Sequence, residues 1–381
     1  MRRAEPVIGI AAANAAVVDR DSRFPAEAFG AIRAGRLLGI LVPKDLGGEG
    51  ASISDVVEIC FRLGRACSST AMIFAMHQIK VACIVRHRRS SVWHDKLLAR
   101  LVREQLLLAS STTEGQGGGN VRVSSAPIEY DGARISLERA GTVLSYGAEA
   151  DGIVTTARRS ADAAPTDQVL VVFLKDEYAL EPIASWDTMG MRGTRSAGFK
   201  FTASGGIDQI LPDPYEQIHT RTMAPVAHLA WSGVWAGIAA GAVERAQSFI
   251  RQAARQANGQ LPPGASHYTK ANASLRVLRD LITASLRKYE AAAEDERTLH
   301  SLDFQTMVNM TKVDASEMAV STVMSALRAC GLSGYRNDGK FTIARLLRDV
   351  LSSPLMISND RILSNIAATA LMSAPPSSLR D

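Results

Sequence analysis

The hydrophobic period of this chain changes twice along its length, and these two changes restrict the fold more than any other feature. In residues 1–105, apolar side chains recur at the spacing of amphipathic helices, as in "AEAFGAIRAGRLLGI". In residues 106–220 they alternate or form short β-branched runs, as in "ARISLERA" and "QVLVVFLK". In residues 221–381 the helical period returns, as in "LRVLRDLITASLRKY". We therefore predict an N-terminal α-helical domain, a middle β-barrel or sandwich domain, and a C-terminal four-helix bundle.

The composition narrows the class of protein further. The 381 residues include 46% hydrophobic and 21% charged side chains, as in soluble globular proteins. A net charge of +5 without a long basic tract argues against nucleic acid as a partner, and no segment is long and apolar enough to predict a membrane span. The cysteines show neither zinc-binding nor disulfide spacing, which predicts no metal site and a cytoplasmic location: Cys60, Cys67, Cys83 and Cys330.

The most unusual short stretch is "SSTTEGQGGGN", residues 110–120, which joins two apparent strands. Glycine lets a backbone come close to a ligand, and exposed backbone N–H groups bind anions. The composition of this turn therefore fits two readings, a surface loop or a ligand-binding loop, and the residues of the turn alone do not separate them.

The order of domains, with a glycine-rich turn opening the β domain, resembles the acyl-CoA dehydrogenase family. Several motifs match in sequence order: "LGILVPKDLGGEGAS", "STTEGQGGGN", "VLSYGAEAD", "WDTMGMRGTRSAGFKF", "AAGAVERAQ", "GLSGY" and "ARLLRD". The resemblance spans nearly the whole chain, and it implies the family's fold of helical domain, β-barrel domain and helical bundle.

The resemblance implies FAD as cofactor and assigns residues to it by position. The glycine-rich turn supplies Ser111, Thr112 and Thr113, which offer hydroxyl and N–H groups to the flavin ring. Ser145 takes the place of a family threonine near flavin N5, where a hydroxyl stabilises the charge of a reduced ring; the alternative is a strand-end hydroxyl bonded to backbone. The other positions assigned to the cofactor are Val143, Leu144, Arg328, Gly331 and Asn359, and those assigned to the substrate are Gly119 and Asn120.

The family's dehydrogenation requires a carboxylate that removes an acyl α-proton, and this chain departs from that pattern. The position eight residues after the Arg-Asp pair holds Ile357, and the alternative position on the first long bundle helix holds Val234. The nearest carboxylate is Asp360, which follows Ser358 and Asn359 in "SNDRILSNIAATAL". Asp360 is therefore either a relocated base or part of a helix N-terminus.

Two further departures concern the flavin. The family tryptophan that shields the ring corresponds to Val143, and the arginine that reaches the FAD of a neighbouring subunit corresponds to Gln260. Arg328, in place of a family glutamine, is a candidate to restore the lost positive charge.

Three functions remain open from the sequence. The first is oxidation of an acyl thioester, on CoA or an acyl carrier protein, with electrons passing to an electron-transfer flavoprotein or to oxygen. The second is a flavin-dependent monooxygenase of the same fold, which needs no α-proton base. The third is a non-catalytic subunit of a heteromeric dehydrogenase. The small-residue stretch "WAGIAAGA" permits close helix approach, and we expect it to form the interface of a homotetramer or dimer.

Overall fold

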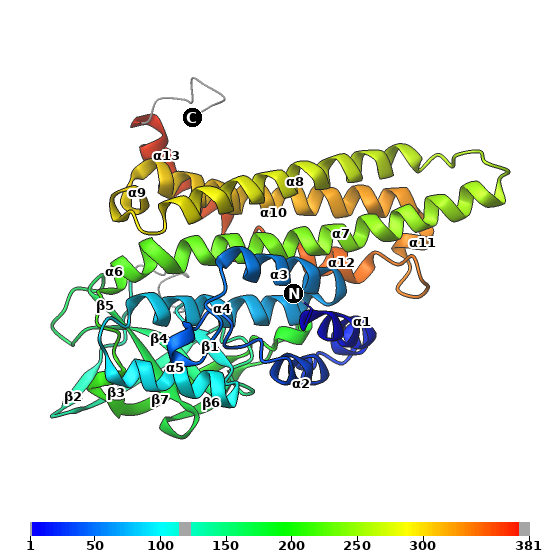
Figure 1. The fold of residues 1–381 in the computed structure, drawn as a ribbon. Helices are drawn as coiled ribbons and strands as arrows, with labels where there is room; N and C mark the ends of the chain where they lie inside the picture. Colours follow the sequence, from blue (N-terminus) through cyan, green and yellow to red (C-terminus); the bar gives the residue numbers. More distant parts are fainter. Residues whose placement is uncertain (1, 114–122, 373–381) are drawn as a thin grey trace.

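Helices alone form the N-terminal part of the computed structural model, which describes residues 2–113 and 123–372 (Figure 1). The chain's apolar periodicity produces them, and Ser52 starts the third with a capping box in which its side chain accepts from the Asp55 backbone N–H. The long helices are α1 (Ala4–Arg20), α2 (Ala26–Ala34), α3 (Ile53–Ala66), α4 (Ser68–His87) and α5 (Val92–Glu104).

The middle domain contains two sheets in the described residues. Its strands are β1 (Leu108–Ser111), β2 (Glu129–Asp131), β3 (Arg134–Gly141), β4 (Gly152–Arg158), β5 (Gln168–Leu174), β6 (Tyr178–Ala184) and β7 (Gly198–Gly206). One sheet has the order β1-β4-β5, with β1 parallel to β4, and the other has the antiparallel order β2-β3-β7-β6. Phe173 of the first sheet contacts Phe201 of the second, with ring centroids 6.0 Å apart, and both are buried. The domain is therefore a small sandwich rather than one continuous barrel.

Long helices return after the sheets and pack as a bundle (Figure 1). They are α7 (Ala224–Gln256), α8 (Ala265–Ala292), α10 (Leu302–Cys330) and α13 (Asn359–Met372), with the shorter helices α6 (Tyr215–Ile218), α9 (Glu296–His300), α11 (Leu332–Tyr335) and α12 (Ala344–Val350) between them. A π-helical turn, η5 (His219–Met223), joins α6 to α7. The predicted fold class, helices followed by sheets and a helical bundle, is confirmed.

The small-residue stretch of α7 has a different partner from the one we expected. It packs against α3 of the same chain, where a side chain on Gly237 would lie 2.2 Å from the carbonyl oxygen of Phe61. Gly64 of α3 approaches α7 equally closely, because its Cβ would lie 2.5 Å from the Val234 carbonyl oxygen. The stretch therefore serves an intramolecular helix pair, and the expected oligomer needs another surface.

The prediction that no segment is long and apolar enough to span a membrane was wrong by length and composition, because the helical segments Ser68–His87 and Tyr215–Gln256 both pass that test. Most of their residues are buried inside the protein, since α4 and α7 pack against each other and against α3. Packing in the protein core accounts for their apolar composition.

Candidate functional site

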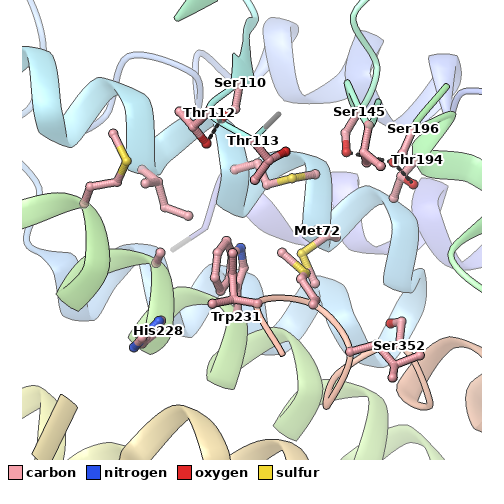
Figure 2. Close-up of a pocket in the computed structure, with 18 of the residues that line it drawn as sticks. Met72, Ser110, Thr112, Thr113, Ser145, Thr194, Ser196, His228, Trp231 and Ser352 are labelled. Carbon is pink, nitrogen blue, oxygen red and sulfur yellow. Dashed lines mark hydrogen bonds between the residues drawn. The ribbon is translucent and has the colours of Figure 1, made fainter. Parts of the chain in front are cut away.

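A cavity of about 630 Å³ opens where the three domains meet. Its walls come from α4, the end of β1, the loops around residues 142–145 and 186–196, the start of α7, and the segment 352–358 after α12. This size lies in the range of small-molecule and cofactor sites. Figure 2 shows most of the labelled hydroxyl side chains along one side of the cavity, and Met72, Trp231, His228 and the hydroxyl of Ser352 on the other.

The polar side of the cavity contains a chain of three hydroxyls. Thr194 Oγ1 donates to the Met191 carbonyl oxygen at 2.8 Å, which uses its only hydrogen. Ser196 must then donate to Thr194, at 2.8 Å, and Ser145 must donate to Ser196, at 2.7 Å. Ser145 is left with free lone pairs, so it acts as a hydrogen-bond acceptor toward the cavity (Figure 2).

Backbone hydrogen bonds fix this hydroxyl chain in place. The Leu144 N–H donates to the Ala197 carbonyl oxygen at 2.9 Å, and the Tyr146 N–H donates to the Thr194 carbonyl oxygen at 2.8 Å. Ser145 lies between these two bonds and is therefore held opposite Ser196.

Unusual backbone conformations cluster around the cavity. Tyr146, Met191, Arg195 and Ile357 all have positive φ, at 43°, 54°, 46° and 50°. A β-branched residue such as Ile357 rarely adopts this region, and such strain concentrates at functional sites.

The buried carboxylate of Asp349 anchors the loop that carries Met191. It accepts from the Met191 N–H at 2.8 Å. Close packing at Gly190, where a Cβ would lie 2.1 Å from the Arg348 carbonyl oxygen, brings this loop against α12. The Arg-Asp pair of the "ARLLRD" motif thus positions the cavity wall.

The apolar side of the cavity includes Met72 and Met76 of α4, Trp231 of α7, and Met356. His228, also on α7, is buried, and burial lowers its pKa to about 3. The neutral ring donates from Nδ1 to the Val308 carbonyl oxygen at 3.3 Å, which leaves Nε2 as an acceptor.

A buried hydrogen-bonded triad positions the π-helical turn, which contributes His219 and Met223 to the cavity. Burial lowers the pKa of His87, and its Nδ1 donates to Asp213 Oδ2 at 2.7 Å. Thr222 donates to Nε2 at 2.8 Å. The triad has no access to the cavity and is therefore structural; π-helical turns are common next to functional sites.

No aspartate or glutamate is among the cavity-lining residues within 2–113 and 123–372. Ile357 does line the cavity, so an apolar side chain occupies the wall where the family resemblance places its base. Asp360 is exposed in the first turn of α13 and outside the cavity, a position that suits a helix N-terminus. Val234 is buried in the bundle, also outside the cavity.

The structure brings only part of the predicted cofactor set together. Thr112, Thr113, Val143 and Ser145 line the cavity, whereas Ser111 and Leu144 are buried behind its wall. Three others do not line it: Arg328, which is exposed on α10, Gly331, which ends α10, and Asn359, which is buried against Lys312. Gly119 and Asn120 lie outside the described residues.

Sequence reasoning missed many side chains of this cavity, among them Lys80, His219, His228, Trp231 and Arg361. Lys80 alone left a signal, as an isolated lysine within the apolar helix "SSTAMIFAMHQIKVACIVRH". The others occur in helical segments where a core position and a cavity position have the same pattern.

This fold and site define a class of proteins with a ligand cavity at the junction of a helical domain, a β domain and a helical bundle. Two family models match the chain, acyl-CoA dehydrogenase N-terminal domain over residues 10–105 and acyl-CoA dehydrogenase C-terminal domain over residues 223–372. The chain belongs to the acyl-CoA dehydrogenase family.

Similar proteins fall into two functional groups. The probable acyl-CoA dehydrogenase FadE25 of Mycobacterium tuberculosis is 23% identical over 95% of this chain and 91% of its own. The amino sugar nitrososynthase DnmZ of Streptomyces peucetius is 24% identical over 89% of this chain and 84% of its own. The crystal structure of FMN-bound TdsC from Paenibacillus sp. A11-2 superposes with a TM-score of 0.85, at 20% identity and with 99% of each chain covered. That likeness establishes the shared fold.

Proposed function

We propose that this chain is a flavin-dependent monooxygenase. The observation that carries the proposal is a cavity with a hydroxyl-rich side and an apolar side whose described lining contains no carboxylate. Removal of an acyl α-proton requires a base at hydrogen-bond reach, whereas oxygen transfer does not. TdsC, the dibenzothiophene monooxygenase of Paenibacillus, and the nitrososynthase DnmZ support this choice over dehydrogenation.

The residues of the cavity fit a flavin ring. Thr112, Thr113 and Ser145 offer polar groups on one side, and Ser145 is an acceptor for a ring N–H because Ser196 takes its hydrogen. As an acceptor, Ser145 favours a flavin nitrogen that carries a hydrogen atom. The sequence had led us to expect a hydroxyl that donates to, and so stabilises, a negatively charged ring. The methionines and Trp231 on the other side exclude water from the reacting groups.

A bound reduced flavin would supply the two electrons and two protons that monooxygenation consumes when one atom of dioxygen enters the substrate and the other leaves as water. The family resemblance predicts FAD, whereas TdsC was crystallised with FMN. Denaturing the purified protein and separating the released FMN and FAD by chromatography decides between them.

The expected assembly of the chain into a dimer or tetramer remains a prediction.

Acyl-CoA substrates should leave the visible absorbance of the flavin unchanged under anaerobic conditions. Without a positioned base, proton removal loses on the order of 10²–10⁴ in rate. The measurement adds butyryl-CoA and octanoyl-CoA to the flavin-loaded wild type, to Ile357→Glu and to its matched control Ile357→Gln. Rapid bleaching of the wild type would overturn the monooxygenase proposal. A protein that refuses both FMN and FAD would instead support the partner-subunit hypothesis.

Oxygen transfer itself is tested with isotope-labelled dioxygen. The flavin-loaded protein is chemically reduced, mixed with a panel of aryl sulfides, indoles and amines, and exposed to labelled oxygen. Label in an organic product, detected by mass spectrometry, supports the proposal. Label recovered only in water or hydrogen peroxide across the panel counts against it.

Ser145→Ala should weaken flavin binding by about fivefold, because a hydrogen bond contributes about 1 kcal/mol. The dissociation constant is measured by flavin fluorescence quenching. Thr283→Ala, which removes an exposed hydroxyl on α8, is the matched control. Equal affinity of Ser145→Ala and wild type would show that Ser145 does not contact the flavin.

A further inference from the structure

Lys80 is a buried cation in the wall of the cavity. Lys80 is 3% exposed. It lies two turns after Met72 and one turn after Met76, on the face of α4 that borders the cavity. Lysine is almost never fully buried unless its ammonium group has a partner.

The hydrogen bonding of Lys80 is incomplete within the described part of the chain. Its one hydrogen bond there goes from Nζ to the thioether sulfur of Met223, at 3.5 Å. Tyr215 donates to the same sulfur atom, also at 3.5 Å. A thioether is a weak acceptor for an ammonium donor. An unpaired buried ammonium is costly, so this geometry indicates an acceptor that the protein does not itself provide.

We propose that Lys80 binds an anionic group of the substrate, which is a small organic acid such as a carboxylate or sulfonate with an apolar body. This assignment deepens the proposed function, because it concerns the substrate of the same cavity. The anionic group replaces the Met223 sulfur as acceptor, and the apolar body contacts the Met76 and Trp231 side of the cavity. An ammonium–carboxylate hydrogen bond is about twice as strong as a neutral one.

Matched pairs of acids and amides test the proposal. Acetate, hexanoate and benzoate are titrated against acetamide, hexanamide and benzamide by isothermal calorimetry, using the purified chain with and without bound flavin. At least one acid should bind about tenfold or more tightly than its amide, because a hydrogen bond to a charged group contributes about 1.5–3 kcal/mol. The preference should disappear in both Lys80→Met and Lys80→Gln, and it should persist in Lys288→Met, which removes an exposed lysine on α8.

Two results would overturn the assignment. The first is equal binding of every acid and its amide by wild type, or a preference that survives both Lys80 variants. The second is a wild-type preference for FMN over riboflavin that both Lys80 variants lose, which would assign Lys80 to the cofactor phosphate. The calorimetry requires neither oxygen nor turnover. The monooxygenase proposal can therefore fail while the anion preference stands, and the reverse also holds.

Discussion

Replacing Lys80 with methionine should raise the free energy of unfolding by about 3 kcal/mol. Burial lowers the pKa of Lys80 from 10.5 to about 8, and each pKa unit corresponds to about 1.4 kcal/mol of unfavourable burial of the charged form. Methionine has a similar length and no charge, and the partner left behind is a thioether, which needs no donor. The substitution therefore removes a cost without leaving an unsatisfied group.

Chemical denaturation at several pH values measures this gain. Below about pH 8 the lysine is protonated in both the native and the unfolded state, so the full cost is present. Between about pH 8 and 10.5 the native state releases its proton while the unfolded state keeps it, so wild type gains stability and the difference from Lys80→Met shrinks. Lys80→Arg retains the charge and should show no gain. A destabilised Lys80→Met would mean that the ammonium group has a stabilising partner after all.

A gain in stability that accompanies a loss of binding is the expected mark of a residue retained for function. Replacing a residue that only supports the fold would instead lower the protein's free energy of unfolding. The denaturation result therefore bears on the anion proposal independently of calorimetry.

The order of domains was predictable because it depends on local periodicity. Helical and alternating hydrophobic patterns can be recognised in short runs of neighbouring residues. The change from helix α5 to strand β1 falls between Glu104 and Leu108. Pairing between distant segments was not predictable in the same way. The small-residue stretch of α7 correctly indicated a close helix contact, yet its partner is α3, and nothing in the local sequence identifies that partner.

In the cavity, too, residues in local motifs were predictable and contacts between distant segments were not. Thr112, Thr113 and Ser145 were found because they lie in or next to motifs that a family resemblance places at the flavin. Lys80 and Met223 are 143 positions apart in the sequence, so no local sequence pattern predicts their contact. The positive φ of Ile357 also escaped notice, because an isoleucine gives no signal for a left-handed conformation.

The cavity wall formed by residues 352–358 depends on a second buried lysine, Lys312 of α10. Lys312 is 0% exposed. Its Nζ donates to the Ser353 carbonyl oxygen at 3.1 Å, to the Ile357 carbonyl oxygen at 2.8 Å and to Asn359 Oδ1 at 2.6 Å. One ammonium group therefore joins the segment after α12 to the start of α13. It also holds the carbonyl group of the residue with the strained backbone, Ile357.

Lys312→Met should lower the free energy of unfolding by about 3 kcal/mol, the opposite sign from Lys80→Met, although burial lowers both lysine pKa values to about 8. The pKa compares charged with neutral lysine, whereas the substitution compares lysine with a side chain that donates nothing. At position 312 the Ser353 and Ile357 carbonyl oxygens lose their donor, whereas Asn359 Oδ1 keeps only the longer hydrogen bond from Ser316 Oγ at 3.4 Å. Each unsatisfied buried group costs about 1–3 kcal/mol. Chemical denaturation measures the loss, with Lys288→Met as the exposed control.

The same substitution should also weaken flavin binding, because the released segment carries Ile357 and Met356 in the cavity wall. Fluorescence quenching of the flavin measures this effect under conditions where the variant remains folded. If Lys312→Met were as stable as wild type and bound flavin equally well, the three hydrogen bonds would not hold the segment. The strained conformation of Ile357 would then have to be maintained by its neighbours alone. Because such a conformation costs on the order of 1–3 kcal/mol, it persists only where surrounding contacts oppose its relaxation, and the buried ammonium group supplies the most direct of them.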